Sequence, residues 1–121
     1  MDFISVALGG ALGALGRYAI SLLPVRSVFP WPTLFTNILG ALLIGFIVGI
    51  SEVRAQCRPN AVLFWKTGVC GGFTTFSTFS LEAFNLLDNK MFFTAVLYIA
   101  LSVSGCLLGI VCGRKIAALR F

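Results

Sequence analysis

The residues best suited to chemistry in this sequence lie in one short run, at positions 71–80, which reads GGFTTFSTFS. The run places two glycines and five hydroxyl side chains between apolar flanks. A Gly-Gly pair followed by Thr-Thr is a weak place for a helix. In an apolar surrounding, freed carbonyl groups must be satisfied by protein or by an ion. The run therefore predicts a helix broken in mid-membrane, of a kind that commonly holds cations.

Two phenylalanines in this run, Phe76 and Phe79, alternate with hydroxyl side chains and so differ from ordinary apolar filler. They are three positions apart, which makes them neighbours on one helix face. Ser77 and Thr78 lie between them, and their hydroxyls can donate or accept hydrogen bonds. A ring edge attracts an anion without the full charge that would bind it too tightly for release. This combination suits a small, strongly hydrated anion.

A second polar feature precedes the run by about 35 residues and shares one helix face with small residues. Thr33, Asn37, Ala41, Gly45 and Gly49 follow one another at four-residue spacing. The Asn37 amide is costly to leave in lipid and must face protein or water. An interhelical hydrogen bond is as good an explanation as a pore role when Asn37 is taken alone. The polar run at 71–80 shifts the balance toward a functional role for Asn37.

The composition indicates which elements position these residues. The chain has 121 residues, of which 59% are hydrophobic and 11% charged, and its mean hydropathy is +1.01. A soluble domain of this size could not bury so much apolar surface. A membrane-spanning helix needs about 20 mostly apolar residues. We therefore expect an all-α integral membrane protein with a single membrane domain over 1–121 and four transmembrane helices, at about 3–23, 33–51, 61–86 and 91–112. Three prolines predict a loop at 24–32, because proline blocks regular helix, and a basic tail is expected at 113–121.

Charge and cysteine content exclude other classes of protein. The net charge of +5 comes from nine basic and four acidic residues, and the basic ones lie mostly at span ends and loops. Membrane lipid and topology explain this pattern better than nucleic acid. Six basic residues on one side against three on the other favour cytoplasmic termini, but leave single and mixed topology both open. Four cysteines without a CxxC pair or any histidine make the usual zinc sites improbable.

Three blocks of the sequence match one known family in order and spacing. GVCGGFTTFSTFSLE (68–82) closely resembles the signature of the CrcB/Fluc fluoride channels, and GGALGALGRY (9–18) and PTLFTNILG (32–40) are similar to the same family. The resemblance implies a fluoride-selective channel in the cell inner (plasma) membrane. It implies passive export of fluoride from the cytoplasm, which relieves fluoride toxicity. Pro32 and Thr36 depart from the usual family residues near the pore entrance.

The resemblance also implies an assembly and a set of site residues. Members of the family are antiparallel, dual-topology homodimers with two pores and a central sodium ion. Carried over to this sequence, the sodium ligands are the backbone carbonyls of Gly71 and Thr74. The fluoride pore residues are Asn37, Phe76, Phe79, Thr33, Ser77 and Thr78. The pore-end or vestibule residues are Glu82 and Arg17. For Glu82 and Arg17, interface anchoring or an ion pair remains as good an explanation as transport.

Two other functions are alternatives to a channel. A coupled exporter resembling the small multidrug transporters would need a carboxylate within the first helix, which here has none beyond Asp2. Three helices carry small residues at four-residue spacing, which predicts close helix packing: Gly9 and Gly13; Ala41, Gly45 and Gly49; and Gly105, Gly109 and Gly113. An assembly subunit without conduction would explain these glycine stripes but would leave the polar run at 71–80 without a purpose. An enzyme is not expected, because no nucleophile and base pair can be assembled without histidine or buried acids.

Overall fold

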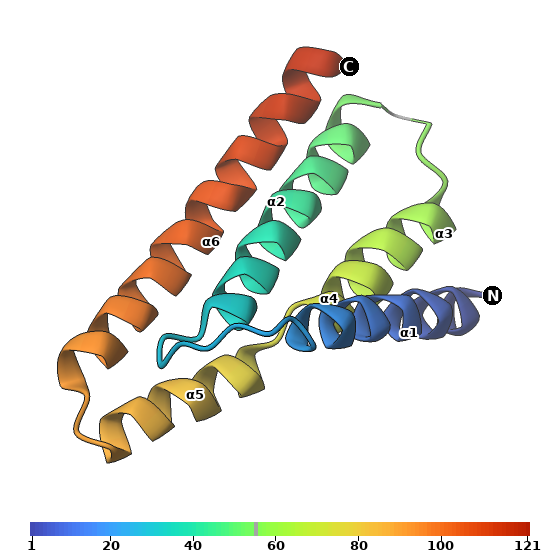
Figure 1. The fold of residues 1–121 in the computed structure, drawn as a ribbon. Coiled ribbons are helices and arrows are strands. Elements are labelled where there is room, and N and C mark those ends of the chain that lie inside the picture. The colour runs from blue at the N-terminus through green and yellow to red at the C-terminus, as the bar shows by residue number, and fades with distance from the viewer. Residues whose placement is uncertain (55) are drawn as a thin grey trace.

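The computed structural model describes residues 1–54 and 56–121, which are helical and contain no strand (Figure 1). Three helices are long and apolar enough to cross a membrane, namely α1, α2 and α6. The remaining helical segments come from the third expected span. In chain order the elements are α1 (Asp2–Ser21), α2 (Trp31–Val53), α3 (Pro59–Val62), the π-helix η1 (Leu63–Cys70), α4 (Gly71–Phe73), α5 (Phe76–Asp88) and α6 (Phe92–Arg120).

The third expected helix is interrupted where the sequence predicts a break. α3, η1 and α4 follow one another without a gap and end at Phe73, and α5 begins at Phe76. Thr74 (φ −81°, ψ 155°) and Thr75 (φ −150°, ψ 118°) between them are extended. Thr75 is the N-cap of α5, and its side chain accepts a hydrogen bond from the Thr78 amide. The break is therefore a defined structure with its own cap.

Several helix ends lie one or two residues outside the expected ranges and the end of α6 lies further outside; the start of α2 and the end of α6 have clear local reasons. α2 begins at Trp31, although 24–32 was expected to be a loop because of its prolines. Pro32 lies in the first turn, where proline is tolerated because its missing amide has no helical partner. α6 continues to Arg120, although 113–121 was expected to be a tail. The tail is rich in good helix formers, and Ala117 within it is fully buried.

Glycines bring α2 and α6 together along most of their length, and the two helices run side by side (Figure 1). A Cβ added at Gly45 would collide with the backbone of Ile110. One at Gly113 would collide with the backbone of Leu42 and Phe46. Such close approach lets van der Waals contact hold helices that gain little from hydrophobic burial in lipid. The small-residue stripes of the sequence are thus packing surfaces.

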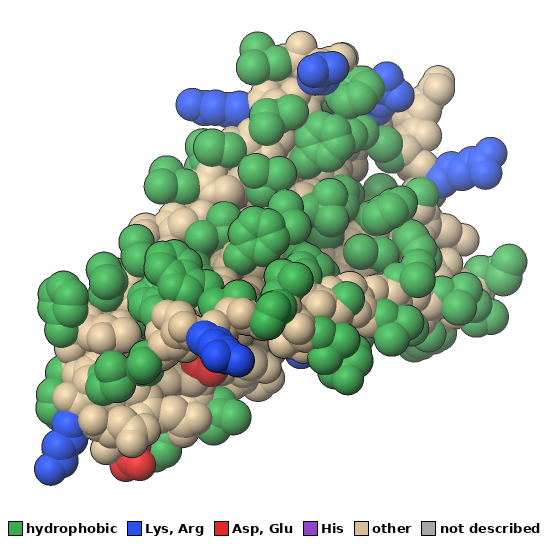
Figure 2. Space-filling model, in the orientation of Figure 1, with side chains coloured by type: hydrophobic (Ala, Val, Ile, Leu, Met, Phe, Trp, Pro, Cys, Tyr) green, Lys and Arg blue, Asp and Glu red, His purple; other side chains and the backbone are tan. Residues whose placement is uncertain are grey.

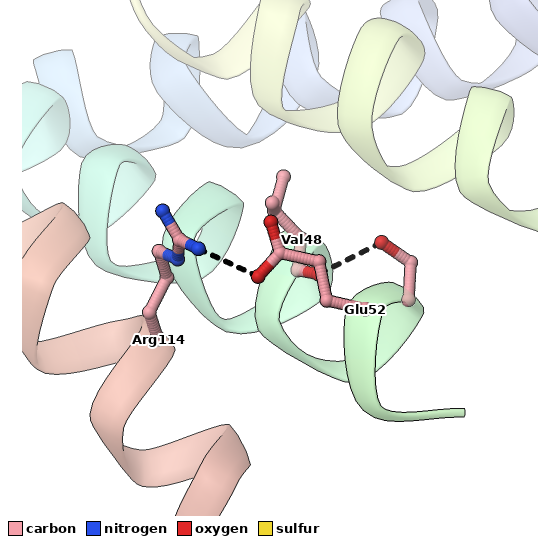
Figure 3. Close-up of polar contacts among 4 residues, drawn as sticks. Val48, Glu52 and Arg114 are labelled. Atoms are coloured by element: carbon pink, nitrogen blue, oxygen red, sulfur yellow. Dashed lines mark hydrogen bonds and ion pairs between the residues drawn. The ribbon is translucent and has the colours of Figure 1, made fainter. Parts of the chain in front are cut away.

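An ion pair at the surface joins the C-terminal part of α2 to α6 (Figure 3). Arg114 Nη2 donates to Glu52 Oε2 at 2.7 Å, and the two side chains are about half exposed. The Arg54 guanidinium lies 4.4 Å from the centroid of the Phe121 ring. An exposed ion pair contributes no more than about 1 kcal/mol. These contacts tie the end of α6 to α2 without deciding the fold.

Close backbone contact also joins α1 to the broken segment. Gly9 lies against the backbone of Phe64 and Gly68. Gly13 lies against the backbone of Val69, Gly72 and Phe73. The two glycines are the buried residues of α1. Most of the remaining α1 surface is exposed. α1 therefore positions the break mainly through this one narrow glycine contact.

We expect Gly13→Ala to destabilise the fold, because the new methyl group would meet the backbone of Val69 and Phe73. Overpacking of this kind costs about 1–3 kcal/mol, which should lower the melting temperature measured in detergent. Gly10→Ala is the matched control, since a Cβ there has no atom within 4 Å. Equal melting temperatures for the two variants would contradict the glycine contact.

The outer surface of the chain is largely apolar. Figure 2 shows hydrophobic side chains over most of one face, with Lys and Arg gathered mainly toward the ends of the helices. Large exposed side chains include Phe3, Leu12, Phe76 and Phe93. Such a surface suits lipid or another apolar protein surface. The buried core is small and consists of Leu34, Phe79, Ala83, Leu86, Ala95 and Tyr98.

Candidate ion pathway at the helix break

The side chain of Asn37 clamps the break. Its Nδ2 donates to the Thr75 carbonyl at 3.1 Å, and its Oδ1 accepts from the Thr75 amide at 2.8 Å. One side-chain amide thereby satisfies both backbone groups of an extended residue, as a neighbouring strand would do. Asn37 lies on α2, so α2 sets the position at which the third span opens. Asn37 thus makes an interhelical contact, and it also lines the larger of two cavities at the break.

The Asn37 clamp and the Thr75 N-cap each leave one backbone carbonyl without its helical donor. In a continuous helix the Thr75 amide would bond the Gly71 carbonyl, but it donates to Asn37 instead. The Thr78 amide would bond the Thr74 carbonyl, but it donates to Thr75 Oγ1 at 3.2 Å. Gly71 and Thr74 line the same cavity. Two uncharged oxygen donors of this kind fit a hard cation such as sodium.

Arg17 reaches the break from α1. Its Nε lies 3.4 Å from the Gly72 carbonyl and donates to it, and the side chain is part-buried. The carbonyl lies near the C-terminal end of α4, where a cation complements both the unpaired backbone oxygens and the helix dipole. Arg17 was expected at a pore end, with interface anchoring as an equal explanation. In the structure its guanidinium contacts the backbone of the broken helix.

Glu82 bridges α2 and α6 from its place on α5. Its Oε1 accepts from Thr33 Oγ1, and its Oε2 accepts from Tyr98 Oη, each at 2.8 Å. Tyr98 is fully buried. Hydrogen bonds from two hydroxyl groups thereby satisfy both carboxylate oxygens of this part-buried side chain. Glu82 forms no ion pair within residues 1–54 and 56–121, and its role in anchoring or transport stays a prediction.

Phe76 and Phe79 lie next to each other but differ in burial. Their ring centroids are 5.6 Å apart. Phe76 is 80% exposed, whereas Phe79 is 9% exposed and packs on Tyr98 with ring centroids 5.2 Å apart. Both line one cavity together with Asn37. Phe76 thus has little packing within its own chain beyond the ring of Phe79.

Two cavities meet at the break and together contain most of the predicted site residues. The larger, about 600 Å³, is lined by Asn37, Gly71, Thr74, Phe76 and Phe79 among others. The smaller, about 190 Å³, is lined by Arg17, Thr33, Thr78 and Glu82 among others. Thr75 lines both. Ser77 lines neither; it is exposed, and its Oγ lies 3.3 Å from Thr75 Oγ1.

This polar break between two cavities occurs in a chain that matches a known family over most of its length. The family model described as "CrcB-like protein, Camphor Resistance (CrcB)" matches residues 4–114. The chain belongs to the CrcB family. The resemblance expected from the sequence is thereby confirmed.

Curated relatives of this CrcB-family chain carry the name of a fluoride channel. Fluoride-specific ion channel FluC 2 of Bacillus licheniformis is 43% identical over 120 residues, covering 96% of this chain and 89% of its own. Fluoride-specific ion channel FluC of Clostridium perfringens is 45% identical over 119 residues, covering 96% and 93%. The FluC of Methanocaldococcus jannaschii is 40% identical over 117 residues, covering 96% and 94%.

This CrcB-family chain has two further polar residues at the site that the sequence analysis did not name. Tyr98 binds Glu82, and Ser102, one helical turn later on α6, lines the larger cavity. The Ser102 Oγ is buried and has no hydrogen-bond partner among the described residues. A tyrosine and a serine four apart in an apolar span share one face, and that spacing was the available signal.

Proposed function

We propose that the chain forms a fluoride-selective channel that lets fluoride leave the cytoplasm by passive electrodiffusion. The observation that carries the proposal is the Asn37 clamp on Thr75, which lies between two cavities and beside Phe76 and Phe79. Amide, hydroxyl and ring-edge groups there present partial positive charge without a full cation in the constriction. The relatives named fluoride-specific ion channels agree with this assignment.

The proposed route needs no energy input. Hydrogen fluoride crosses the cell membrane as a neutral molecule and dissociates inside, which traps the anion. Fluoride enters one cavity hydrated, loses water at the break, and gains contacts from ring edges and hydroxyl groups in exchange. The unpartnered Ser102 hydroxyl is one further donor available to it. The anion then leaves down its electrochemical gradient, which relieves fluoride toxicity.

We infer that the functional unit is an antiparallel homodimer with two pores, inserted in the plasma membrane in both orientations. Phe76 is 80% exposed beside a wide, mostly apolar cavity, so the single chain leaves its candidate pathway open on one side. A second copy packed there would enclose the pathway and bury the ring. The largely apolar surface of Figure 2 offers the remaining area to lipid.

A central sodium ion is also part of the proposal. The Gly71 and Thr74 carbonyls would hold it, from each subunit, because their helical donors are diverted by Asn37 and by Thr75 Oγ1. When bound, sodium would supply positive charge that satisfies these oxygens. The protein residues keep the oxygens available by fixing the extended conformation between α4 and α5.

Removal of sodium tests this part separately. Purification in N-methyl-D-glucamine salts in place of sodium salts should lower the melting temperature of the dimer and reduce fluoride flux severalfold. Returning sodium should restore both quantities. Identical stability and flux in the two salts would contradict a bound sodium ion. This result would not bear on the proposed roles of the pathway residues.

The function itself is tested by efflux from liposomes that contain the purified protein and are loaded with fluoride. A fluoride electrode should record rapid release once a potassium ionophore allows charge balance, with little chloride release in matched vesicles. Release without a proton gradient would exclude a coupled exporter. Retention of fluoride in vesicles that hold folded protein would contradict the channel and favour a silent assembly subunit.

A further inference from the structure

One charged side chain lines the larger cavity, and the function described above does not use it. Lys66 lies on η1 and faces the same cavity as Asn37, Phe76 and Phe79. The other residues lining this cavity are uncharged. Lys66 is exposed, and the ion pair formed by the described residues joins Glu52 to Arg114 instead. The lining of the larger cavity therefore carries a net positive charge.

The position of Lys66 along the third span places its charge inside the expected membrane region. It precedes Thr74 by eight residues, or about two helical turns. A lysine within a span is costly unless it faces water or a partner. Its flexible four-carbon stem lets the ammonium group remain in the water of the cavity. It lies on a π-helix, a form that is frequent at functional sites.

The smaller cavity does not share this imbalance of charge. Its lining contains Arg17 and Glu82, whose formal charges cancel. The two cavities that meet at Thr75 therefore differ electrostatically, with excess positive charge only in the larger one. A cation on the wall of a wide cavity raises the local anion concentration, and Lys66 does so from about two helical turns before the break and not at the break itself.

We propose that Lys66 is the residue that collects the anion at the wide end of the pathway. It acts through the field in the cavity and not by contact at the constriction, so it sets the rate of entry and not the choice between fluoride and chloride. This inference rests on the proposed channel function and adds a residue that sets the conduction rate.

The test measures fluoride current through the reconstituted protein at fixed fluoride and varied concentrations of an impermeant salt. The Debye length falls from about 30 Å at 0.01 M to about 3 Å at 1 M. Lys66→Gln should therefore lower the current about threefold at low salt and leave it unchanged at 1 M. Lys66→Arg should keep the wild-type salt dependence, and Lys66→Glu should fall below Lys66→Gln at low salt.

Lys115→Gln is the matched control, because Lys115 is exposed on α6 and is not among the residues lining the cavity. It should conduct as the wild type does at every salt concentration. A Lys66→Gln loss that is equal at low and high salt would indicate a structural role and overturn the inference. So would wild-type current in Lys66→Gln, or an equal loss in Lys115→Gln. A wild-type protein without fluoride current would instead overturn the channel function itself.

Discussion

Replacing Asn37 with alanine is expected to reduce fluoride flux by at least about tenfold and to destabilise the protein. The substitution leaves the Thr75 amide and carbonyl without the partner that holds both. Each unsatisfied buried group costs about 1–3 kcal/mol, and a factor of ten in flux corresponds to about 1.4 kcal/mol. The freed Thr75 amide could then bond the Gly71 carbonyl and close the break. Flux and melting temperature should be measured on the same preparation.

Two further variants distinguish the effect of the two Asn37 hydrogen bonds from the effect of removing any polar side chain. Asn37→Asp keeps an acceptor for the Thr75 amide but loses the donor to the Thr75 carbonyl and adds negative charge, so flux should fall with a smaller loss of stability. Asn85→Ala is the matched control, because Asn85 is an exposed asparagine of α5. Wild-type flux in Asn37→Ala, with the fold intact, would contradict the role given to the clamp.

The second large effect is expected at the phenylalanines. Phe76→Ile should cut fluoride flux by about tenfold or more while the dimer stays assembled, because Phe76 is 80% exposed in the single chain and contributes little to the packing of that chain. The aliphatic side chain fills similar space but has no positive ring edge to offer the anion. Flux should be compared in liposomes that hold equal amounts of dimer.

Phe79→Ile should combine two effects. Its ring is buried among Tyr98 and Leu34, so the substitution should reduce flux and also lower stability by about 1–3 kcal/mol. Phe84→Ile is the control, since Phe84 is a 60% exposed residue of α5 outside both cavities. Unchanged flux in both Phe76→Ile and Phe79→Ile would exclude a ring-edge contact with the anion.

The sequence predicted best those features that depend on local chemistry. The break at Thr74 and Thr75 follows from glycine and threonine types within a few positions, so it could be placed before the fold was known. The glycine stripes likewise predicted close helix packing, which the contacts of Gly45 and Gly113 confirm. The start of α2 at Trp31 was missed because proline was treated only as a helix breaker.

The contacts between helices could not be predicted, because they depend on how distant segments approach. Asn37 and Thr75 are 38 positions apart, and the use of both amide atoms on one residue is a tertiary feature. The same holds for Tyr98 on Glu82 and for Arg17 on the Gly72 carbonyl. The sequence identified Glu82 and Arg17 as candidates but left their roles open, since charge near a span end has several uses.

These contacts give a physical account of the proposed ion pathway, which has no charged constriction. Asn37 diverts the Thr75 amide from the Gly71 carbonyl, while Phe76 and Phe79 line the cavity beside the break. The same amide thus shapes the backbone break and borders the proposed path of the anion.

The most direct test of the central claim is the reversal potential of the purified protein in a planar bilayer under a tenfold fluoride gradient with symmetric chloride. A fluoride-selective channel should reverse near the fluoride equilibrium potential, about 59 mV in magnitude. Doubling the chloride on one side should leave that value unchanged. A reversal near zero, or one that follows chloride, would contradict fluoride conduction by this chain.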